Sequence, residues 1–577
     1  MQAESADSPY TSEMVTDILV MGSGAAGLSA SLFAAAEGLT VVVCEKSDQI
    51  GGTTATSAGT VWVPGSRNAE QAGLSDSRAA VETYLDGELR GFGGGDLRRA
   101  YLESAPEAIE QLEKNSDVKF LAAARHPDYH DGPGSTQGGR ALVPAPFDGR
   151  LLGDDFRLIR PPIKEFLLLG GMMVNKDDIT HLINRFRSWR SFRHSVALVT
   201  RYCLDRLRYP RGTRLVMGNA LVGRLFNSLR QKRSITLRLG WAVSELIMQD
   251  GRVTGAVITK GDGRCVIRAR LGVVLAGGGF PQGQGLRAEL MPARAAGQRS
   301  LGFAGNTGDG IRLARQAGGT VESDHDVPAF LVPVSVMRRN DGSEAVFPHI
   351  YLDRAKPGVI AVNRHGLRFI NEADSYHDVV LAMYRTEDAI PAYLICGAGF
   401  IEKYGMGMVP PGATNFSRFV DAGYLLEAFS IGELAGKIGV PGVALEATIE
   451  RYNRDAAKGI DSDYGRGSTE LNRFNGDPEQ QPNPCVGPIK GPRYFAMAMW
   501  PGDIGTSTGI RTDENGVVLN ARSEPIAGLY ACGNDMSSVM RGRYPGPGIT
   551  LGPAITFSYR AVMHAAGRPR MPGRNIP

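Results

Sequence analysis

The pattern of apolar and polar positions is clearest near the N-terminus, where two short apolar runs flank an alanine-rich segment. Residues 17–21 and 39–44 are dominated by β-branched and other apolar residues, which is typical of buried strands. Residues 28–37 are mostly good helix formers, and Gly38 follows them as a helix-ending residue. The pattern therefore predicts a strand–helix–strand unit at the start of the fold.

A glycine-rich turn connects the first of these strands to the helix. Gly22 permits a tight turn, Gly24 lets a pyrophosphate approach the backbone, and Gly27 allows the helix to pack on the strand. Glu45 stands at the end of the second strand, where an acid can hold ribose hydroxyls. In this full context the glycines predict a nucleotide-binding domain of the Rossmann type rather than a turn without a ligand.

Three later segments favour FAD as the nucleotide. Residues 51–59 form a loop of glycines and hydroxyl side chains that is suited to wrapping a diphosphate and a ring system. Residues 272–280 and 528–535 each predict a strand that runs into a turn, and both resemble the returning strands of FAD-dependent flavoproteins of the two-dinucleotide type. No second strand–glycine turn–helix unit appears, so we do not expect a tightly bound NAD(P)H.

Composition narrows the class of protein. The chain has 577 residues, of which 42% are hydrophobic and 21% charged, so it is long enough for two or three globular domains. A net charge of +4 is too small to argue for nucleic-acid binding. The six cysteines are scattered without a CxxC pair, which indicates no metal site and fits a reducing cytoplasm. No apolar run approaches the about 20 residues that span a bilayer.

The segments described above predict an α/β fold in which a cofactor domain is interrupted. Residues 1–14 are polar and acidic, and we expect a disordered leader rather than a signal peptide. Residues 15–280 are predicted to form the first part of a Rossmann-like FAD-binding domain, and residues 437–577 its last part. Residues 281–436 are predicted to form an inserted α+β cap, or substrate domain. The active site is expected where cap and FAD-binding domain meet.

Residues 156–214 are predicted to be a basic helical insertion in the first part. The segment mixes apolar runs with many arginines, and Trp189 and Phe192 lie among them. Four interpretations remain open: a peripheral contact with a membrane surface, an oligomer contact, a lid over the substrate, or the solvated basic face of an ordinary helix. Binding to anionic vesicles that salt weakens would favour the first.

Near the C-terminus, residues 543–554 combine a tyrosine, two Pro-Gly pairs and the start of a predicted helix. Tyr544 stands four residues before Gly548, and a run of small and apolar residues follows. A phenol O–H and a backbone N–H at a helix start are two donors that can converge on one oxygen. This arrangement suits an enzyme that polarises a ketone.

Together these features resemble the fumarate reductase/succinate dehydrogenase flavoprotein superfamily, and within it most closely the 3-ketosteroid Δ1-dehydrogenases. The most specific segments are residues 366–372, 503–506 and 544–552. Fumarate reductases carry a catalytic arginine where this chain has Tyr-Pro-Gly-Pro-Gly, which argues against a dicarboxylate substrate. Succinate dehydrogenases attach FAD through a histidine in the early loop, and residues 51–65 contain none, so non-covalent FAD is implied.

The resemblance also implies catalytic residues. A tyrosine and a glycine of the family bind the substrate carbonyl oxygen, and Tyr544 and Gly548 match them. Tyr129 matches a second active-site tyrosine. Tyr351 is our choice for the base that removes the α-proton; its match is displaced by a few residues, and His349 or neither residue remains open.

Other polar residues of the cap have competing interpretations. Arg368 and Glu372 are expected to form an ion pair that shapes the cap rather than to act in catalysis. The Tyr376-His377-Asp378 sequence is either a relay or a helix start that faces solvent.

The motifs and the resemblance together imply a set of residues that contact FAD. They are Gly22, Ser23, Gly24, Ala25, Ala26, Gly27, Glu45, Lys46, Gly52, Thr53, Thr54, Ser57, Gly59, Val243, Ala276, Gly277, Gly278, Gly533, Asn534, Asp535, Gly548, Ile549, Thr550 and Leu551. No metal site is expected.

The expected activity is an FAD-dependent dehydrogenation that introduces a C=C bond next to a ring ketone. The substrate is expected to be a hydrophobic cyclic ketone, with steroids first and smaller cyclohexanone-type rings second. Two alternatives remain open: a C=C reductase of the fumarate reductase type, and a flavin-binding protein without catalysis. The electron acceptor is unknown, with a quinone as one candidate, and the oligomeric state is undetermined. A cytoplasmic location is expected, with or without peripheral membrane contact.

Overall fold

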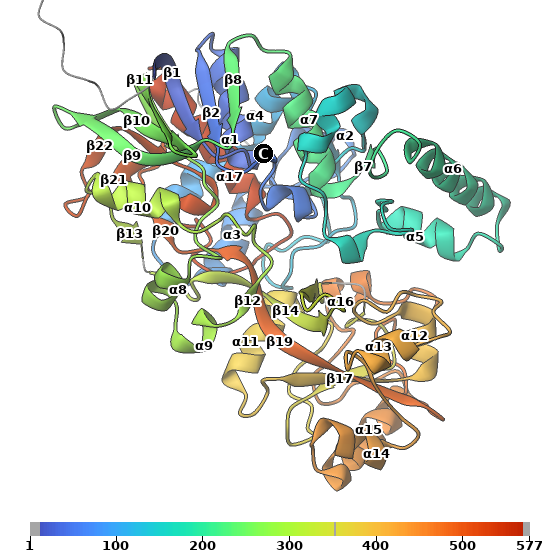
Figure 1. Ribbon diagram of the computed structural model, residues 1–577. Helices are drawn as coiled ribbons and strands as arrows, with labels where there is room; N and C mark the ends of the chain where they lie inside the picture. The colour runs from blue at the N-terminus through green and yellow to red at the C-terminus, as the bar shows by residue number, and fades with distance from the viewer. Residues whose placement is uncertain (1–11, 323, 351–352, 569–577) are drawn as a thin grey trace, which may run out of the picture.

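The computed structural model describes residues 12–322, 324–350 and 353–568 (Figure 1). Tyr351, chosen as the base, therefore lies outside the described residues, as does most of the predicted leader. The prediction of a leader to residue 14 is wrong for its last three residues, because β1 (Ser12–Met21) already begins there and pairs with a neighbouring strand. Within the described residues, no helix has the length and apolar character needed to cross a membrane.

The first domain is built on a sheet of eight strands, ordered β21-β22-β11-β1-β2-β8, with β10 and β9 continuing from β11. The predicted strand–helix–strand unit is present as β1, α1 (Ala25–Ala36) and β2, and β1 and β2 pair in parallel. The remaining strands of this sheet are β2 (Val41–Glu45), β8 (Ile235–Leu239), β9 (Ala242–Gln249), β10 (Arg252–Lys260), β11 (Gly263–Leu275), β21 (Val517–Leu519) and β22 (Pro525–Ala531).

The two returning strands predicted from their apolar runs join this sheet. β11 lies parallel to β1, and β22 lies parallel to β11, although the paired residues lie more than 250 positions apart in the sequence. Helix α17 (Leu551–Ala565) packs against α1 and against α4 (Gly95–Asn115). The nucleotide-binding domain is thus assembled from the two ends of the chain.

Further helices and small sheets complete this domain. The helices are α2 (Arg67–Gln71), α3 (Arg78–Glu88), α7 (Met217–Arg230) and α10 (Asp309–Gln316). Helix α10 contacts β9 of the first sheet, so the predicted start of the cap at residue 281 is wrong for this helix. Helices α8 (Gln284–Leu290) and α9 (Ala293–Ala296) adjoin the second sheet, where Arg287 of α8 bonds to Asp503. The short strands are β3 (Val61–Trp62), β4 (Phe120–Ala122), β5 (Ala141–Pro144), β6 (Phe147–Asp148), β7 (Arg214–Leu215), β13 (Val321–Glu322) and β20 (Gly509–Ile510).

The cap is built on a second, mainly antiparallel sheet, which lies below the first domain in Figure 1. Its central path is β15-β14-β19-β17-β16, and β12 and β18 also pair with β19. The strands are β12 (Arg299–Ser300), β14 (Ala329–Arg338), β15 (Glu344–Pro348), β16 (Val359–Val362), β17 (Ala392–Gly397), β18 (Leu426–Ala428) and β19 (Tyr494–Thr506). The cap helices are α11 (Tyr376–Arg385), α12 (Ala398–Tyr404), α13 (Ser417–Asp421), α14 (Ile431–Ile438), α15 (Gly442–Ala456) and α16 (Glu470–Asn475).

The cap extends further along the chain than the predicted boundary at residue 436. Strand β19 pairs with β14 on one side and with β17 on the other, so it is central to the second sheet. Helices α14 and α15 share a buried apolar cluster with β16 and β17. Residues 437–506 therefore contribute to the cap rather than to the last part of the first domain. The difference arises because strand pairing joins residues that lie 97 to 177 positions apart in the sequence, which a linear pattern does not reveal.

The basic insertion is helical, as predicted. It contains the 3-10 segments η2 (Gly149–Leu158) and η3 (Lys164–Phe166), followed by α5 (Lys176–Ile183) and α6 (Trp189–Asp205). In Figure 1 the α5–α6 pair projects from the side of the first domain.

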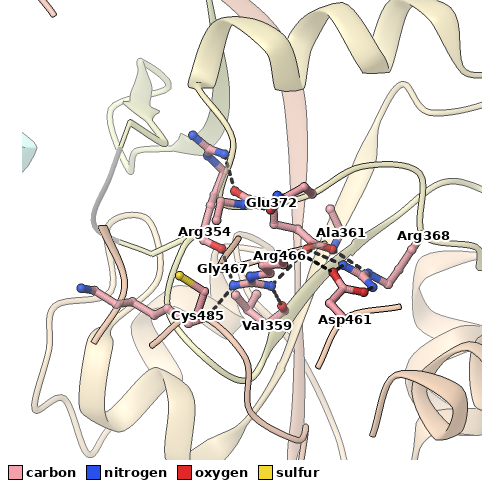
Figure 2. A network of polar contacts seen from close by, with 12 residues as sticks. Arg354, Val359, Ala361, Arg368, Glu372, Asp461, Arg466, Gly467 and Cys485 are labelled. Atoms are coloured by element: carbon pink, nitrogen blue, oxygen red, sulfur yellow. Dashed lines mark hydrogen bonds and ion pairs between the residues drawn. The ribbon is translucent and has the colours of Figure 1, made fainter. Parts of the chain in front are cut away.

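A buried ionic network holds the cap together (Figure 2). Arg368 forms two hydrogen bonds with Glu372, at 3.0 and 2.8 Å, and two with Asp461, at 2.7 and 2.9 Å. Arg466 donates to the Glu372 carboxylate at 3.1 Å and to the carbonyl oxygens of Val359 and other residues. The predicted Arg368–Glu372 ion pair is confirmed. It belongs to a network that ties β16 to the loop before α16.

We expect Glu372→Ala to unfold the cap at much lower temperature. The change leaves two buried guanidinium groups without this carboxylate, and removing one partner of a buried ion pair typically costs about 3–5 kcal/mol. Thermal unfolding followed by circular dichroism measures the loss. Glu524→Ala, which removes an exposed pair with Arg522, is the control and should change stability by about 0.5 kcal/mol or less. Equal losses in the two variants would contradict a structural role for the network.

Candidate functional site

An aromatic cluster forms where the first domain meets the cap. The ring of Tyr544 stacks on Tyr129 at a centroid distance of 5.4 Å and meets Tyr376 edge-on at 5.2 Å. Phe330 from β14 and His377 from α11 contact the same ring at 5.6 and 5.9 Å. All five side chains are buried. The structure therefore brings together Tyr544 and Tyr129, which the sequence had singled out.

The hydroxyl groups of the three tyrosines are linked. Tyr129 donates to the Tyr376 hydroxyl at 3.3 Å, and Tyr376 is also hydrogen-bonded to Tyr544. Burial raises the pKa of Tyr544 to about 12, an effect that the bond with Tyr376 partly opposes. Tyr544 therefore remains a protonated phenol near neutral pH and is available as a hydrogen-bond donor.

The loop that carries Tyr544 is fixed by its neighbours. The Pro545 carbonyl oxygen accepts hydrogen bonds from the Tyr84 hydroxyl at 2.6 Å and from the Tyr129 N–H at 2.9 Å. Gly548 has a φ of +95°, and a Cβ there would lie 2.6 Å from the Thr60 carbonyl oxygen. Only glycine fits this position, because any side chain would collide with backbone.

The N–H of Gly548 has no hydrogen-bond acceptor among the described residues. It lies just before α17, whose N-cap Thr550 makes no side-chain capping bond. A small cavity between the cap and the start of α17 is lined by Phe330, Thr506, Gly533, Asn534, Met536, Ser537, Ser538, Val539, Ile549, Thr550, Pro553, Ala554 and Phe557. Ile549 and Thr550 line this cavity, and Gly548 directly precedes them at the start of α17. A helix N-terminus of this kind favours an electronegative ligand atom.

Tyr376 is the functional candidate that sequence reasoning did not select. Ser375 caps α11 by accepting from the Asp378 N–H, so the predicted helix start is correct. The solvent-facing interpretation is wrong, because Tyr376 and His377 are both buried against Tyr544. The sequence did contain one indication that Tyr376 is functional, because it lies just after the family-specific segment 366–372.

His349 occupies a different environment. Its ring lies against Phe347, and its Nδ1 is 2.6 Å from the Asp353 carboxylate. The charge interaction with His349 helps to hold the pKa of Asp353 well below its usual range, against the effect of burial. These contacts lie in the cap, and the rings that touch Tyr544 do not include His349.

His377 is held neutral in the cluster. Its Nδ1 accepts a hydrogen bond from the Leu331 N–H at 3.1 Å, and burial lowers its pKa to about 4. The tautomer with a proton on Nε2 is therefore favoured. The lining around Tyr544 is consequently aromatic and uncharged.

An ionic contact centred on His130, next to Tyr129 in the sequence, joins the two domains; we call it the His130 clamp. The ring nitrogens of His130 contact Glu88 of α3 at 2.6 Å and Asp378 of α11 at 2.7 Å. Burial lowers the pKa of His130, but the hydrogen bonds with Asp378 and Glu88 outweigh it and raise the pKa to about 10. The imidazolium therefore ties the Tyr129 loop to the helix that carries Tyr376.

The glycine turn after β1 has the close contacts that a dinucleotide site requires. A Cβ on Gly22 would lie 2.4 Å from the Ala276 carbonyl oxygen, and one on Gly27 would lie 2.0 Å from the Gly22 carbonyl oxygen. A Cβ on Gly24, by contrast, would have only the Thr54 hydroxyl within 4 Å. That hydroxyl accepts a hydrogen bond from the Ala25 N–H. The N-cap of α1 is thus left open for a pyrophosphate.

The acid after β2 is oriented toward the turn. Glu45 accepts from the N–H and hydroxyl of Ser23, at 3.0 and 2.7 Å, and from the Ser47 N–H. Lys46 pairs with Asp309 at the start of α10 and donates to Thr307. The Lys46 ammonium is therefore engaged in a protein contact.

The strand ends that complete the site also meet. Asp535 accepts from the Gly277 and Gly279 N–H groups at 2.6 and 2.8 Å, and burial raises its pKa. Thr53 accepts from the Asn306 amide, which also reaches the Gly278 carbonyl oxygen. Ser57 accepts from the Gly59 N–H, and Val243 lies buried on β9.

These contacts fit FAD. An open helix N-terminus suits its pyrophosphate, Glu45 suits its ribose, and the donors at the start of α17 suit an oxygen of its ring system. The described residues of the early loop include no histidine for covalent attachment.

Comparisons with known proteins agree with this assignment. A family model described as an FAD binding domain matches residues 17–551. The chain is similar to a 4-oxocyclohex-2-ene-1-carboxylate 5-dehydrogenase of Sinomonas cyclohexanicum, with 39% identity over 94% of this chain and 92% of the relative. It is also similar to a 3-oxosteroid 1-dehydrogenase of Mycobacterium tuberculosis, with 35% identity over 96% of this chain and 99% of the relative.

A solved structure has the same fold over nearly the full length. It is the 3-ketosteroid Δ1-dehydrogenase of Sterolibacterium denitrificans in complex with 1,4-androstadiene-3,17-dione, with a TM-score of 0.88 and 35% identity. The match covers 96% of this chain and 99% of that one.

We expect Gly27→Ala to weaken both folding and FAD retention. The added methyl group collides with the Gly22 carbonyl oxygen and must move α1, and such overpacking typically costs about 1–3 kcal/mol. The flavin-to-protein absorbance ratio and the unfolding temperature measure the two effects. Gly436→Ala, on the exposed face of α14 with open space at its Cβ, is the control and should keep both values or raise stability.

We expect His130→Gln to flatten the dependence of stability on pH. Because the folded-state pKa of His130 is raised to about 10, its contribution is complete below about pH 6.5 and is lost as pH rises toward 10. The difference in unfolding free energy between wild type and variant should therefore shrink over this interval. His365→Gln, at an exposed pair with Asp388, is the control. A difference that stays constant with pH would rule out a charged His130 clamp.

Proposed function

This chain belongs to the FAD binding domain family, and from that premise we propose that it is an FAD-dependent dehydrogenase that desaturates a cyclic ketone next to its carbonyl. The observation that carries the proposal is the pair of donors formed by the Tyr544 hydroxyl and the Gly548 N–H. Bound FAD, held by the residues described above, would supply the hydride-accepting chemistry.

The two donors polarise the substrate carbonyl. Hydrogen bonds from Tyr544 and Gly548 to the carbonyl oxygen stabilise the negative charge that develops there as the α-proton leaves. Because Tyr544 is buried and keeps its proton, it donates without a change of protonation state. Gly548 contributes a backbone N–H whose position is fixed by its contact with Thr60.

Tyr376 is the base that we propose for the α-carbon. Its hydroxyl accepts a hydrogen bond from Tyr129 and is also hydrogen-bonded to Tyr544, so it is held between the two other tyrosines. The Tyr376 oxygen, in its phenolate form, takes up the α-proton, and FAD, when bound, would supply the acceptor for the β-hydrogen as hydride. Burial of the cluster excludes water from both steps.

The lining of the cluster supports an apolar substrate. Phe330 and the tyrosines offer aromatic faces, and His377 is neutral, so a ring ketone without charge near the reacting carbons fits best. We propose 3-ketosteroids as the first substrate class. Smaller cyclohexenone rings are the second, which is supported by the 39% identity to a dehydrogenase of that kind. For the electron acceptor we propose a quinone. The sequence has no second strand–glycine turn–helix unit, beyond the one that begins at residue 17, to bind NAD(P)H.

We expect anaerobic mixing with a 3-ketosteroid to bleach the flavin absorbance in the wild type. Tyr544→Phe removes one oxyanion donor and should slow this reduction about 10²–10³-fold. Tyr376→Phe removes the base and should slow it at least as much, with the bound flavin unchanged. Tyr404→Phe, a tyrosine that bonds to Asp477 at a distance from the cluster in the cap, is the control and should leave the rate within about twofold.

A parallel assay with a cyclohexenone carboxylate separates the two substrate classes by their reduction rates. Failure of both classes to reduce the flavin would exclude the proposed reaction.

A further inference from the structure

Helix α6 has apolar side chains on two sides. Its inner side buries Leu198 and Tyr202 in a small apolar cluster, with Ser191, Ser195 and Asp205 also buried. The side that faces solvent carries Trp189, 72% exposed, together with Phe192, Val196 and Leu204. A surface helix normally presents polar side chains to water, so this second apolar side is suited to contact with something other than water.

The apolar surface continues beyond the helix. Phe186, in the connection between α5 and α6, is 81% exposed, and Leu207, just after α6, is 84% exposed. The rings of Trp189 and Phe192 stack at 5.5 Å, which fixes a broad aromatic face. We refer to Phe186, Trp189, Phe192, Val196, Leu204 and Leu207 as the α6 outer face.

The charged side chains around this face are almost all positive. Residues 179–211 contain eight arginines and a single acid, Asp205. Asp205 is turned inward, where it accepts from the N–H and hydroxyl of Thr213. Arg187, Arg190 and Arg193 are exposed and have no carboxylate partner within the part of the chain that the structure describes.

The α5–α6 pair is also placed for contact with a large surface. It projects from the side of the first domain (Figure 1). Only the start of α5 reaches the cap in the described contacts, where the Lys176 ammonium lies 3.9 Å from the ring centroid of Phe474.

We propose that the α6 outer face docks on an anionic lipid surface. Exposed tryptophan and phenylalanine insert at the level of the headgroups, and the surrounding arginines pair with anionic headgroups. A second copy of this chain fits less well, because a twofold contact through this face would bring two arginine rims together. This inference does not rest on the proposed dehydrogenation, since it uses none of the residues of the aromatic cluster.

The test is co-sedimentation of the full-length FAD-loaded protein with vesicles. Vesicles of phosphatidylcholine mixed with phosphatidylglycerol should bind about tenfold more protein than vesicles of phosphatidylcholine alone. Raising the ionic strength from 0.05 to about 0.5 M should weaken this binding, because it screens the arginines.

Two pairs of substitutions separate the contributions of ring and charge. Phe186→Ser with Trp189→Ser should reduce binding to the mixed vesicles at least tenfold, and Arg190→Gln with Arg193→Gln should reduce its salt dependence. Phe429→Ser with Val443→Ser, which removes two exposed apolar side chains of the cap, is the matched control and should bind like the wild type. Flavin content and unfolding temperature verify that each variant is folded.

Tryptophan fluorescence gives a second measurement. Trp189 is the most exposed of the four tryptophans, so the mixed vesicles should shift emission to shorter wavelength in the wild type and not in the Trp189 variant. Three results would overturn the proposal: no binding to either vesicle, equal binding to both at all salt concentrations, or a concentration-dependent dimer that the Phe186 and Trp189 changes abolish while vesicle binding is unaffected.

Discussion

The carbonyl oxygen of Pro545 holds the candidate site together. It accepts hydrogen bonds from the Tyr84 hydroxyl and from the Tyr129 N–H, so a helix and a loop of the first domain are both attached to the Tyr544 loop. Three residues later, Gly548 lies so close to Thr60 that no side chain fits. The backbone around Tyr544 and Gly548 is therefore held by contacts with the nucleotide-binding domain, and the Tyr544 ring then packs against Phe330 and Tyr376 of the cap.

The cap contributes the other half of the cluster, and it must be rigid to do so. Its buried ionic network connects Arg368, Glu372, Asp461 and Arg466, immediately before the turn that begins α11. Burying these charges is costly unless every one is paired. Here Glu372 is shared by the guanidinium groups of Arg368 and Arg466, and Asp461 pairs with that of Arg368. The His130 clamp then joins α11 to the first domain through Asp378 and Glu88. Together these contacts hold Tyr376 of the cap next to Tyr544 of the first domain.

The α5–α6 pair is attached to the first domain through the Arg201–Asp148 ion pair and to the cap through Lys176 and Phe474. The inner side of α6 buries Leu198 and Tyr202, whereas its outer face is apolar and ringed by arginine. The outer face uses none of the residues of the tyrosine cluster, so a partner can bind there without contacting that cluster. An enzyme for hydrophobic ring ketones would benefit from proximity to a lipid phase, where such substrates and quinones accumulate.

Local patterns in the sequence were sufficient for the nucleotide-binding unit and for the Tyr544–Gly548 segment, because each is a short contiguous stretch whose glycines and apolar residues act within a few positions. The Arg368–Glu372 pair could also be predicted, since the partners lie four positions apart in the sequence. The cap boundary and the role of Tyr376 could not be predicted from the sequence. Strand β19 joins the cap only by pairing with β14 and β17, which are distant in sequence.

Tyr376 becomes a candidate only because α11 is buried against the Tyr544 ring, and a helix start alone does not reveal which side it buries. The sequence by itself thus determined the cofactor class and singled out the segment from Tyr544 to Gly548. The tertiary structure decided which tyrosine lies opposite this segment, because that choice depends on contacts between segments that only folding brings together.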